Sequence, residues 1–202
     1  MNHRPLKPGT LLSPVPAALI STGRPGEKGT EQNLMTAAWV GTVCSDPPMV
    51  SVSIRPGRYS LEFVDQTGEF FINLTDEKLL KATDYCGVRS GRKENKFEAC
   101  RLTPVSVEGF PWAPAVAESP LCLGCKVRSR QPLGSHVLFL AEITYMSVRE
   151  DLLAPDGSIR LQDAHLIAYH HGLYSPLGDP LGFFGFSVAA PGVLKRRMKQ
   201  LK

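Results

Sequence analysis

Residues 49–60 read M-V-S-V-S-I-R-P-G-R-Y-S and mark the boundary between two kinds of secondary structure. Over residues 49–54, apolar and small polar side chains alternate with a period of two, which predicts a half-buried β-strand. A Pro-Gly turn follows at residues 56–57, and Ser60 is a candidate N-cap for a short helix over residues 61–67. This stretch therefore predicts a strand that leads through a tight loop into a helix.

The loop between that strand and that helix carries two guanidinium groups, Arg55 and Arg58. Helix N-termini favour anions, and arginine binds phosphate oxygens with two parallel hydrogen bonds, so the loop is a candidate phosphate site. Residues 90–97 (S-G-R-K-E-N-K-F) form a second cationic segment that is able to converge on the same anion. The plain alternative is that both segments are solvated loops.

The rest of the chain predicts mostly strands. Helices are predicted over residues 77–85 and 190–201, and a polar glycine-rich loop over residues 23–31. Further strands are predicted over residues 15–22, 34–44, 69–74, 105–107, 121–128, 137–148 and 183–188. We therefore expect a mainly β fold, an antiparallel Greek-key barrel with a few short peripheral helices. One domain is expected over residues 1–202, with an extended arm at 1–14 and a basic tail at 190–202.

Composition excludes several classes of protein. Hydrophobic residues make up 43% and charged residues 21% of the 202 residues, which suits a soluble globular protein. The formal net charge is +4, but five basic residues lie within 195–202, so no basic field suited to nucleic acid covers the body. No apolar run is long enough to span a membrane, and no export signal is recognised. Five scattered cysteines then suit a reducing compartment, and we expect a cytoplasmic protein.

Residues 33–39 (N-L-M-T-A-A-W) are unusual for a strand because two alanines lie beside a tryptophan. Small side chains allow a flat ligand to approach the backbone closely. The alternative is that the alanines pack against another strand and that Trp39 belongs to the core.

Six segments between residues 11 and 188 together resemble the flavin reductase-like family, with the nearest similarity to flavoredoxin-type members. In chain order they are N-L-M-T-A-A-W, C-S-D-P-P-M-V-S-V-S-I-R-P-G-R-Y-S, T-G-E-F-F-I-N-L, S-G-R-K-E-N-K-F, G-S-H-V-L-F-L-A-E-I and L-G-F-F-G-F-S. The resemblance implies an FMN-binding split β-barrel that forms a homodimer, with the flavin near the subunit interface.

The resemblance also implies a set of cofactor-binding residues. The isoalloxazine ring would lie along Met35, Thr36, Ala37, Ala38 and Trp39. The ribityl chain would run past Ser53, Ile54 and Arg55. The phosphate would be held by Tyr59, Ser60, Ser90 and Lys96, and Asn73 would reach the flavin edge or the ribityl hydroxyls.

The activity implied by the resemblance is that of an NAD(P)H:FMN oxidoreductase, with NADH or NADPH as the reductant. The alternative is a flavoredoxin-like electron carrier that a redox protein partner reduces. Related flavin reductases often carry G-D-H where this chain has Gly134, Ser135 and His136, a region linked to nicotinamide use. The missing aspartate leaves both alternatives open, and no catalytic side chain is assigned.

Other chemically active residues have plainer interpretations. Cys122 and Cys125 lie on a predicted strand, where positions three apart face opposite sides, so a zinc or dithiol site is not expected. The adjacent pair at residues 170–171, both histidines, diverges for the same reason. Tyr174 and Cys44 are candidates to approach the flavin, with a buried inert thiol as the alternative for Cys44.

Overall fold

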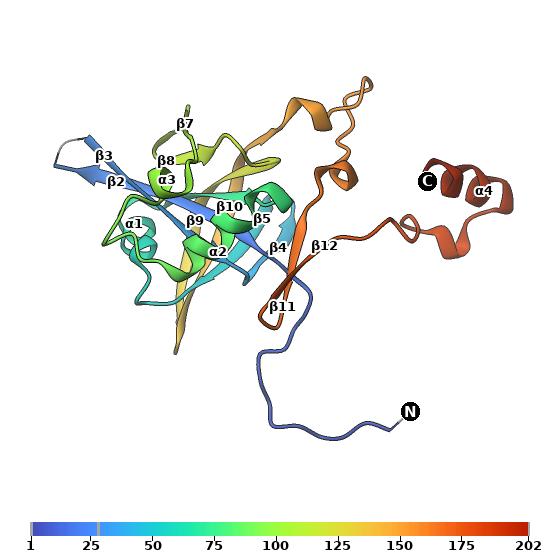
Figure 1. Cartoon of the computed structure of the whole chain (residues 1–202), viewed down its shortest axis with the longest axis horizontal. Coiled ribbons are helices and arrows are strands. Elements are labelled where there is room, and N and C mark those ends of the chain that lie inside the picture. Colours follow the sequence, from blue (N-terminus) through green and yellow to red (C-terminus); the bar gives the residue numbers. More distant parts are fainter. Residues whose placement is uncertain (1, 28, 202) are drawn as a thin grey trace.

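The structure is a computed structural model that describes residues 2–27 and 29–201. Its main element is a seven-stranded antiparallel sheet with the strand order β3-β2-β6-β9-β10-β5-β4, curled into an open barrel (Figure 1). The strands are β2 (Ala18–Gly26), β3 (Gly29–Ala37), β4 (Val40–Ser45), β5 (Pro48–Ile54), β6 (Glu69–Leu74), β9 (Leu121–Leu133) and β10 (His136–Val148). The predicted mainly β fold is confirmed.

The strand and helix predicted around residues 49–67 are present as β5 and α1 (Tyr59–Thr67). Alternation along β5 directs Val50, Val52 and Ile54 into the barrel core, where they pack with apolar side chains of β2, β6 and β10. Gly68 ends α1 in the left-handed conformation, with φ of 68°, as a C-terminal glycine does.

Ser60 is not the N-cap of α1, so that prediction is wrong. Arg58 occupies the N-cap position and makes no side-chain capping hydrogen bond. Ser60 is fully buried, and its Oγ accepts a hydrogen bond of 2.9 Å from Asn33 Nδ2 on β3. The hydroxyl therefore joins α1 to the sheet instead of satisfying the helix end.

Two helices cover the outer surface of β2 and β3 (Figure 1). A 3₁₀ turn (Glu77–Leu79), capped by Asp76, leads into α2 (Leu80–Val88), and Asn95 caps the short α3 (Lys96–Cys100). Leu79, Cys86 and Phe97 pack on Leu19 and Leu34 in a second apolar cluster. This packing fixes the loop between α2 and α3 beside the end of β3.

β8 (Phe110–Val116), β11 (Ile167–His170) and β12 (Leu173–Pro176) were not predicted. β8 pairs with β7 (Pro104–Val107), which matches the strand predicted over residues 105–107. β11 and β12 form a separate three-stranded sheet with β1 (Val15–Pro16), which lies within the strand predicted over residues 15–22. The predicted loop at 23–31 is instead the tip of the β2–β3 hairpin, because both strands extend to its turn. The predicted strand 34–44 is divided into the end of β3 and β4.

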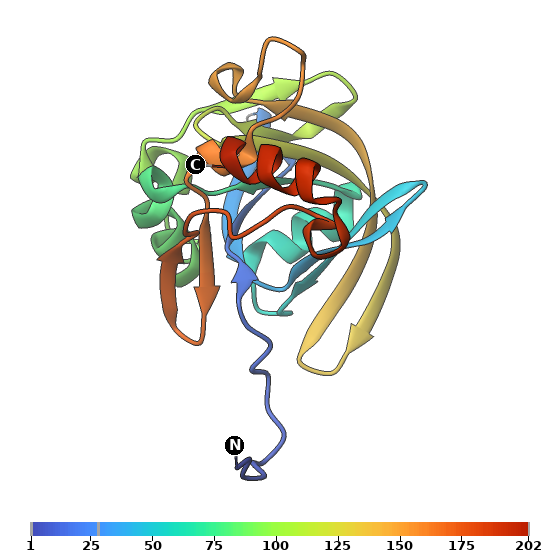
Figure 2. The same ribbon diagram turned by 90° about the vertical axis from the view of Figure 1, so that its right-hand side faces the viewer.

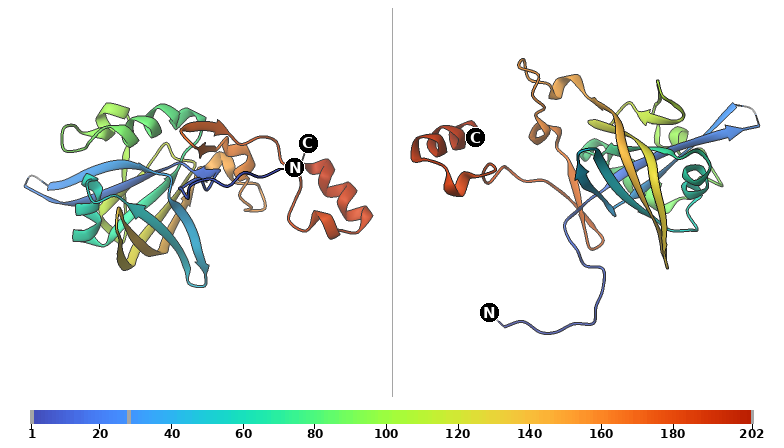
Figure 3. Two further views of the ribbon diagram at one scale, coloured as in Figure 1. Left: turned by 90° about the horizontal axis from the view of Figure 1, so that it is seen from below. Right: turned by 180° about the vertical axis from the view of Figure 1, so that it is seen from behind.

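The strand predicted at residues 183–188 is also absent. Its aromatic composition is typical of a strand, but within residues 2–27 and 29–201 no other strand pairs with it, and Phe186–Val188 forms a 3₁₀ turn. The helix predicted after it is present as α4 (Pro191–Gln200). The arm at residues 2–13 extends away from the barrel (Figure 2), and the C-terminal segment with α4 does so as well (Figures 1 and 3). Among the described residues, no helix combines the length and hydropathy that a membrane crossing requires.

Candidate functional site

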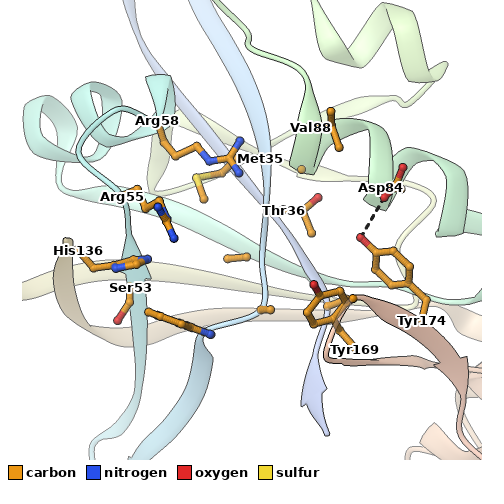
Figure 4. A pocket seen from close by; sticks show the side chains of 16 residues that line it. Met35, Thr36, Ser53, Arg55, Arg58, Asp84, Val88, His136, Tyr169 and Tyr174 are labelled. Atoms are coloured by element: carbon orange, nitrogen blue, oxygen red, sulfur yellow. Dashed lines mark hydrogen bonds between the residues drawn. The ribbon is translucent and has the colours of Figure 1, made fainter. Parts of the chain in front are cut away.

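A cavity of about 410 Å³ lies where β3, the loop after β5, α2 and the β11–β12 hairpin meet (Figure 4). The residues that surround it come from segments up to 157 positions apart. They are Ala17, Met35, Thr36, Ala37, Ala38, Trp39, Ser53, Arg55, Arg58, Asp84, Gly87, Val88, His136, Tyr169, Gly172 and Tyr174.

The floor of the cavity is formed by residues 35–39, at the end of β3 and just after it, and includes the small side chains of Ala37 and Ala38. Trp39 stays 42% exposed and is not a core residue. Its indole lies 4.4 Å from the His136 ring, centroid to centroid, at an angle of 34°. An exposed indole beside an alanine-rich backbone edge provides a flat surface on which a planar ligand is able to stack.

One wall of the cavity is cationic. Figure 4 shows the guanidinium groups of Arg55 and Arg58 turned toward the cavity, above Ser53 and Met35. Neither arginine belongs to an ion pair within residues 2–27 and 29–201. Burial and the nearby Arg55 charge lower the pKa of His136, which favours its neutral form. This wall therefore attracts a negatively charged ligand.

A smaller cavity, of about 70 Å³, continues from this wall and shares Met35, Arg58 and Val88 with the larger one. Its remaining lining is strongly polar and contains no carboxylate among the described residues: Asn33, Gly57, Tyr59, Arg89, Ser90, Gly91 and Lys96. α1 begins at Tyr59, so the positive end of its dipole lies at the same place.

Lys96 is a buried lysine that lines the small cavity. The residue is only 3% exposed, and its Nζ donates to the carbonyls of Leu34 at 2.7 Å and Cys86 at 3.0 Å. No carboxylate in the described part of the chain pairs with this ammonium. Desolvation by burial lowers the pKa of Lys96, with a smaller contribution from the Arg58 charge. A buried cation with only two neutral acceptors retains a third N–H for an anion.

Gly91 brings the α2–α3 loop against β3. A Cβ at this position would lie 2.0 Å from Asn33 Oδ1, so only glycine allows the loop to pass so closely. The same Asn33 donates through its Nδ2 to Ser60 Oγ. The loop, β3 and α1 therefore meet at one polar point beside Lys96.

The opposite wall comes from α2 and the late hairpin. Tyr169 on β11 and Tyr174 on β12 face the cavity across from Arg55, and the Tyr174 hydroxyl donates to Asp84 Oδ1 at 3.4 Å (Figure 4). Burial, and next the Asp84 charge, raise the pKa of Tyr174 to about 12, so the hydroxyl keeps its proton. Asp84 and Tyr169 had no local motif in the sequence; only their place in the fold identifies them.

Ten of the thirteen residues that the resemblance implied border the two cavities. Seven of them line the larger one: Met35, Thr36, Ala37, Ala38, Trp39, Ser53 and Arg55. Three more, Tyr59, Ser90 and Lys96, line the smaller one.

The structure does not bring the side chains of Ile54, Ser60 and Asn73 to either cavity. Ile54 points into the barrel core, and Ser60 lies behind Asn33. Asn73 is fully buried, where it donates to the Leu19 carbonyl and Ser21 Oγ and accepts from the Val116 amide, each at 2.9 Å. Its hydrogen-bonding groups are used inside the fold, so we correct its assignment to the flavin edge.

The other candidate residues have plain structural surroundings. Cys122 and Cys125 face opposite sides of β9, in two different apolar clusters. Cys44 lies in β4 outside the cavity, with its thiol directed at the Asp46 carbonyl. His170 Nε2 lies 2.7 Å from Ser175 Oγ. No cluster of three metal-ligating side chains occurs among the residues that the structure describes.

Comparison with known proteins gives the family. Residues 11–178 match the model of the flavin reductase like domain. The chain belongs to the flavin reductase-like family. Its fold is the split barrel that the resemblance implied.

Three relatives illustrate the similarity. The flavoredoxin of Desulfovibrio vulgaris (Miyazaki F) is 29% identical with a TM-score of 0.82, over 95% of this chain and 100% of that one. The NADH-dependent FMN reductase AsuE2 of Streptomyces nodosus subsp. asukaensis is 26% identical over 84% of this chain and 82% of its own. An uncharacterized protein of Archaeoglobus fulgidus is 34% identical over 57% of this chain, and the match spans 64% of that relative.

Proposed function

We propose that the two connected cavities bind FMN. The planar ring would lie in the larger cavity along residues 35–39, and the phosphate would enter the smaller one. The residues present fit this ligand, because a flat small-residue surface adjoins a carboxylate-free group of cations at a helix start. The names of relatives, one an FMN reductase and another a flavoredoxin, support the same ligand.

The observation that carries the proposal is the buried, unpaired ammonium of Lys96. Burying a charge without a counter-ion is unfavourable, and proteins usually avoid it by pairing or by a shift in pKa. Here the pKa is lowered by burial, and Lys96 borders a polar cavity together with Arg58 and Ser90. A phosphate dianion is the ligand that completes such a set.

Within the proposed complex, each wall has a distinct task. FMN supplies reversible hydride or electron transfer at its ring when it is bound. Arg55 and Arg58 hold positive charge beside the ring and ribityl region, which favours added electrons there. Trp39 and His136 border the open side, where a second planar molecule is able to approach. Tyr169 and Tyr174 cover the other side and reduce access of water.

We propose that the reaction is FMN-dependent oxidoreduction with NADH or NADPH as the reductant. The match to an NADH-dependent FMN reductase over most of both chains supports this choice. The alternative is a flavoredoxin-like carrier reduced by a redox protein partner, and the nearly complete structural overlap with flavoredoxins supports it. Related flavin reductases often carry an aspartate where this chain has Ser135, in a region linked to nicotinamide use. The absence of that aspartate also supports the carrier.

One experiment separates the two functions. The purified protein is loaded with FMN, freed of excess flavin and mixed anaerobically with NADH or NADPH. Loss of visible flavin absorption within seconds supports the reductase. A flavin that only photoreduction bleaches supports the carrier. A protein that stays colourless after FMN is added would refute both.

We further propose a cytoplasmic homodimer. All five cysteines are free thiols, which suits a reducing compartment. The flavin-binding cavity is open on the side of Trp39, so a second subunit has room to border it.

A further inference from the structure

Cys86 and Cys100 are free cysteines whose sulfur atoms lie 3.8 Å apart. Cys86 lies in the last turn of α2, and Cys100 is the final residue of α3. They are 14 positions apart in the sequence and share no motif, so the packing of α2 beside α3 brings them together. The pair is therefore a feature of the tertiary structure, and flavin binding does not require it.

The pair belongs to the apolar cluster that holds α2 and α3 on the barrel. Cys86 is fully buried in one cluster with Leu34 and Phe97, whereas Cys100 is half-buried and packs at the margin of that cluster. Buried cysteines often serve as small apolar side chains, and this is the plain alternative for the pair. Packing alone, however, requires neither contact between the two sulfur atoms nor access to one of them from solvent.

The distance between the two sulfur atoms allows a disulfide to form with little rearrangement. The S–S bond of a disulfide is about 2.05 Å long, so the two atoms must approach by less than about 2 Å. Rotation of the Cys100 side chain and a small shift of α3 supply this movement. Because α3 has only five residues and ends at Cys100, such a shift disturbs few contacts.

The two thiols differ in the way that a stepwise oxidation needs. Burial raises the pKa of Cys86 to about 12 and also raises the pKa of Cys100. At Cys100, the hydrogen bond from Cys86 and the charge of Lys96 oppose the effect of burial on the pKa. Since the thiolate is the nucleophile, the more accessible Cys100 sulfur is the one that reacts first. Cys86 lies in contact behind it, where it is placed to complete a bond.

We propose that Cys86 and Cys100 form a reversible disulfide when the protein meets a hydroperoxide. The Cys100 sulfur attacks one oxygen of hydrogen peroxide, the O–O bond breaks, and the products are a sulfenic acid and one water. The Cys86 sulfur then attacks the sulfenic sulfur, the S–O bond breaks, and the hydroxyl leaves with the Cys86 proton as a second water. The two thiols together lose two electrons, which the peroxide gains. Dithiothreitol restores both thiols by exchange.

The disulfide would close residues 86–100 into a ring that contains part of the smaller cavity. Ser90, Gly91 and Lys96 line that cavity, and Lys96 Nζ donates to the carbonyl of Cys86 itself. Closing a ring of 15 residues disfavours opening of the α2–α3 loop by up to about 100-fold. In a consequence that rests on the proposed FMN site, the closed ring should slow release of a phosphate held by this loop.

Thiol counting and peptide mapping test the disulfide without any flavin. The purified full chain is treated briefly with hydrogen peroxide, unfolded in guanidinium chloride with N-ethylmaleimide, and measured by mass spectrometry. The reduced chain should take up five maleimides, and the oxidised chain three at the mass of a single chain. Trypsin cleaves between the two cysteines, so a non-reduced digest should contain residues 82–89 joined to residues 97–101. Dithiothreitol should separate these two peptides.

Cys44→Ser is the matched control, because Cys44 is a half-buried thiol outside the pair, and this variant should form the same link. Cys100→Ala and, separately, Cys86→Ala should each abolish the link, and one folded variant of the two is sufficient. A chain that keeps five reactive thiols after peroxide treatment overturns the proposal. So does a digest in which other cysteines are linked, or a link that persists in a folded Ala variant.

The rate of FMN release tests the consequence for the flavin site. FMN-loaded protein is diluted, and the recovery of free FMN fluorescence gives the rate. This rate should fall about tenfold or more after oxidation and return to its first value after reduction, whereas peroxide should not change it in Cys100→Ala. A linked chain that releases FMN at the rate of the reduced chain overturns the coupling between disulfide and flavin. A reduced chain that binds no FMN refutes the proposed flavin site, and the peptide map still decides the disulfide.

Discussion

Replacing Lys96 by methionine tests the proposed phosphate site most directly. The variant keeps an unbranched apolar stem and removes the buried ammonium. A hydrogen bond between charged groups contributes about 1.5–3 kcal/mol, so the Kd for FMN should rise about 10- to 150-fold. Riboflavin has the same ring and no phosphate, so its Kd should change less than about threefold. Titration of each flavin, followed by quenching of its fluorescence, measures both constants.

Lys93→Met is the matched control, because Lys93 lies in the same loop with its side chain exposed. Its effect on either flavin should stay within about twofold. Lys96→Met also leaves the carbonyls of Leu34 and Cys86 without their ammonium donor, so urea unfolding must show that the variant is folded at the titration temperature. If FMN and riboflavin lose affinity equally in a folded variant, Lys96 supports the fold and does not hold the phosphate.

Four further outcomes are expected. Adding Arg55→Ala to the Lys96 variant should weaken FMN further and riboflavin less, in the same titration. Burial lowers the pKa of Lys96 below 10.5, so its ammonium loses its proton at a lower pH than a free lysine does. The affinity for FMN should therefore be highest below that pKa and fall as the pH rises through it, while the affinity for riboflavin should not change over this pH range. Asn73→Ala should lower the free energy of unfolding by about 2–4 kcal/mol in urea, since three buried hydrogen bonds are lost. Tyr174→Phe should lower it by less than about 1 kcal/mol, because the bond to Asp84 is long and partly exposed.

The parts of the fold that sequence predicts well depend on local physics. The alternation of apolar and polar residues over 49–54 places one face of β5 in the barrel core. This pattern can be recognised without knowing which strand lies beside β5. Gly68 ends α1 because a left-handed residue is needed there, and that need is local too. Residues 183–188 show the limit of such patterns. An aromatic run has strand propensity, but a strand exists only where another strand pairs with it.

The candidate site also has parts that sequence predicts and parts that it does not. Sequence motifs predicted residues 35–39, Arg55 and Lys96 as site residues, and the fold brings them to adjoining cavities. The sequence did not predict the wall made by Asp84 and Tyr169, because α2 and β11 border the same cavity only through the packing of distant elements. No spacing along the chain contains that information.

The buried polar groups of this protein are of two kinds, and the difference is the basis of the proposed phosphate site. Glu69 accepts from the amides of Trp112 and Ala113 and pairs with Lys126, so its charge is balanced within the fold. Asn73 is likewise satisfied by three internal partners. Lys96 is not balanced: two carbonyls accept from an ammonium whose charge has no counter-ion among the described residues. Because an uncompensated buried charge is unfavourable, an arriving anion gains both its own hydrogen bonds and relief of that penalty. The proposed affinity for a phosphate would follow from this incompletely paired group of polar residues beside β3.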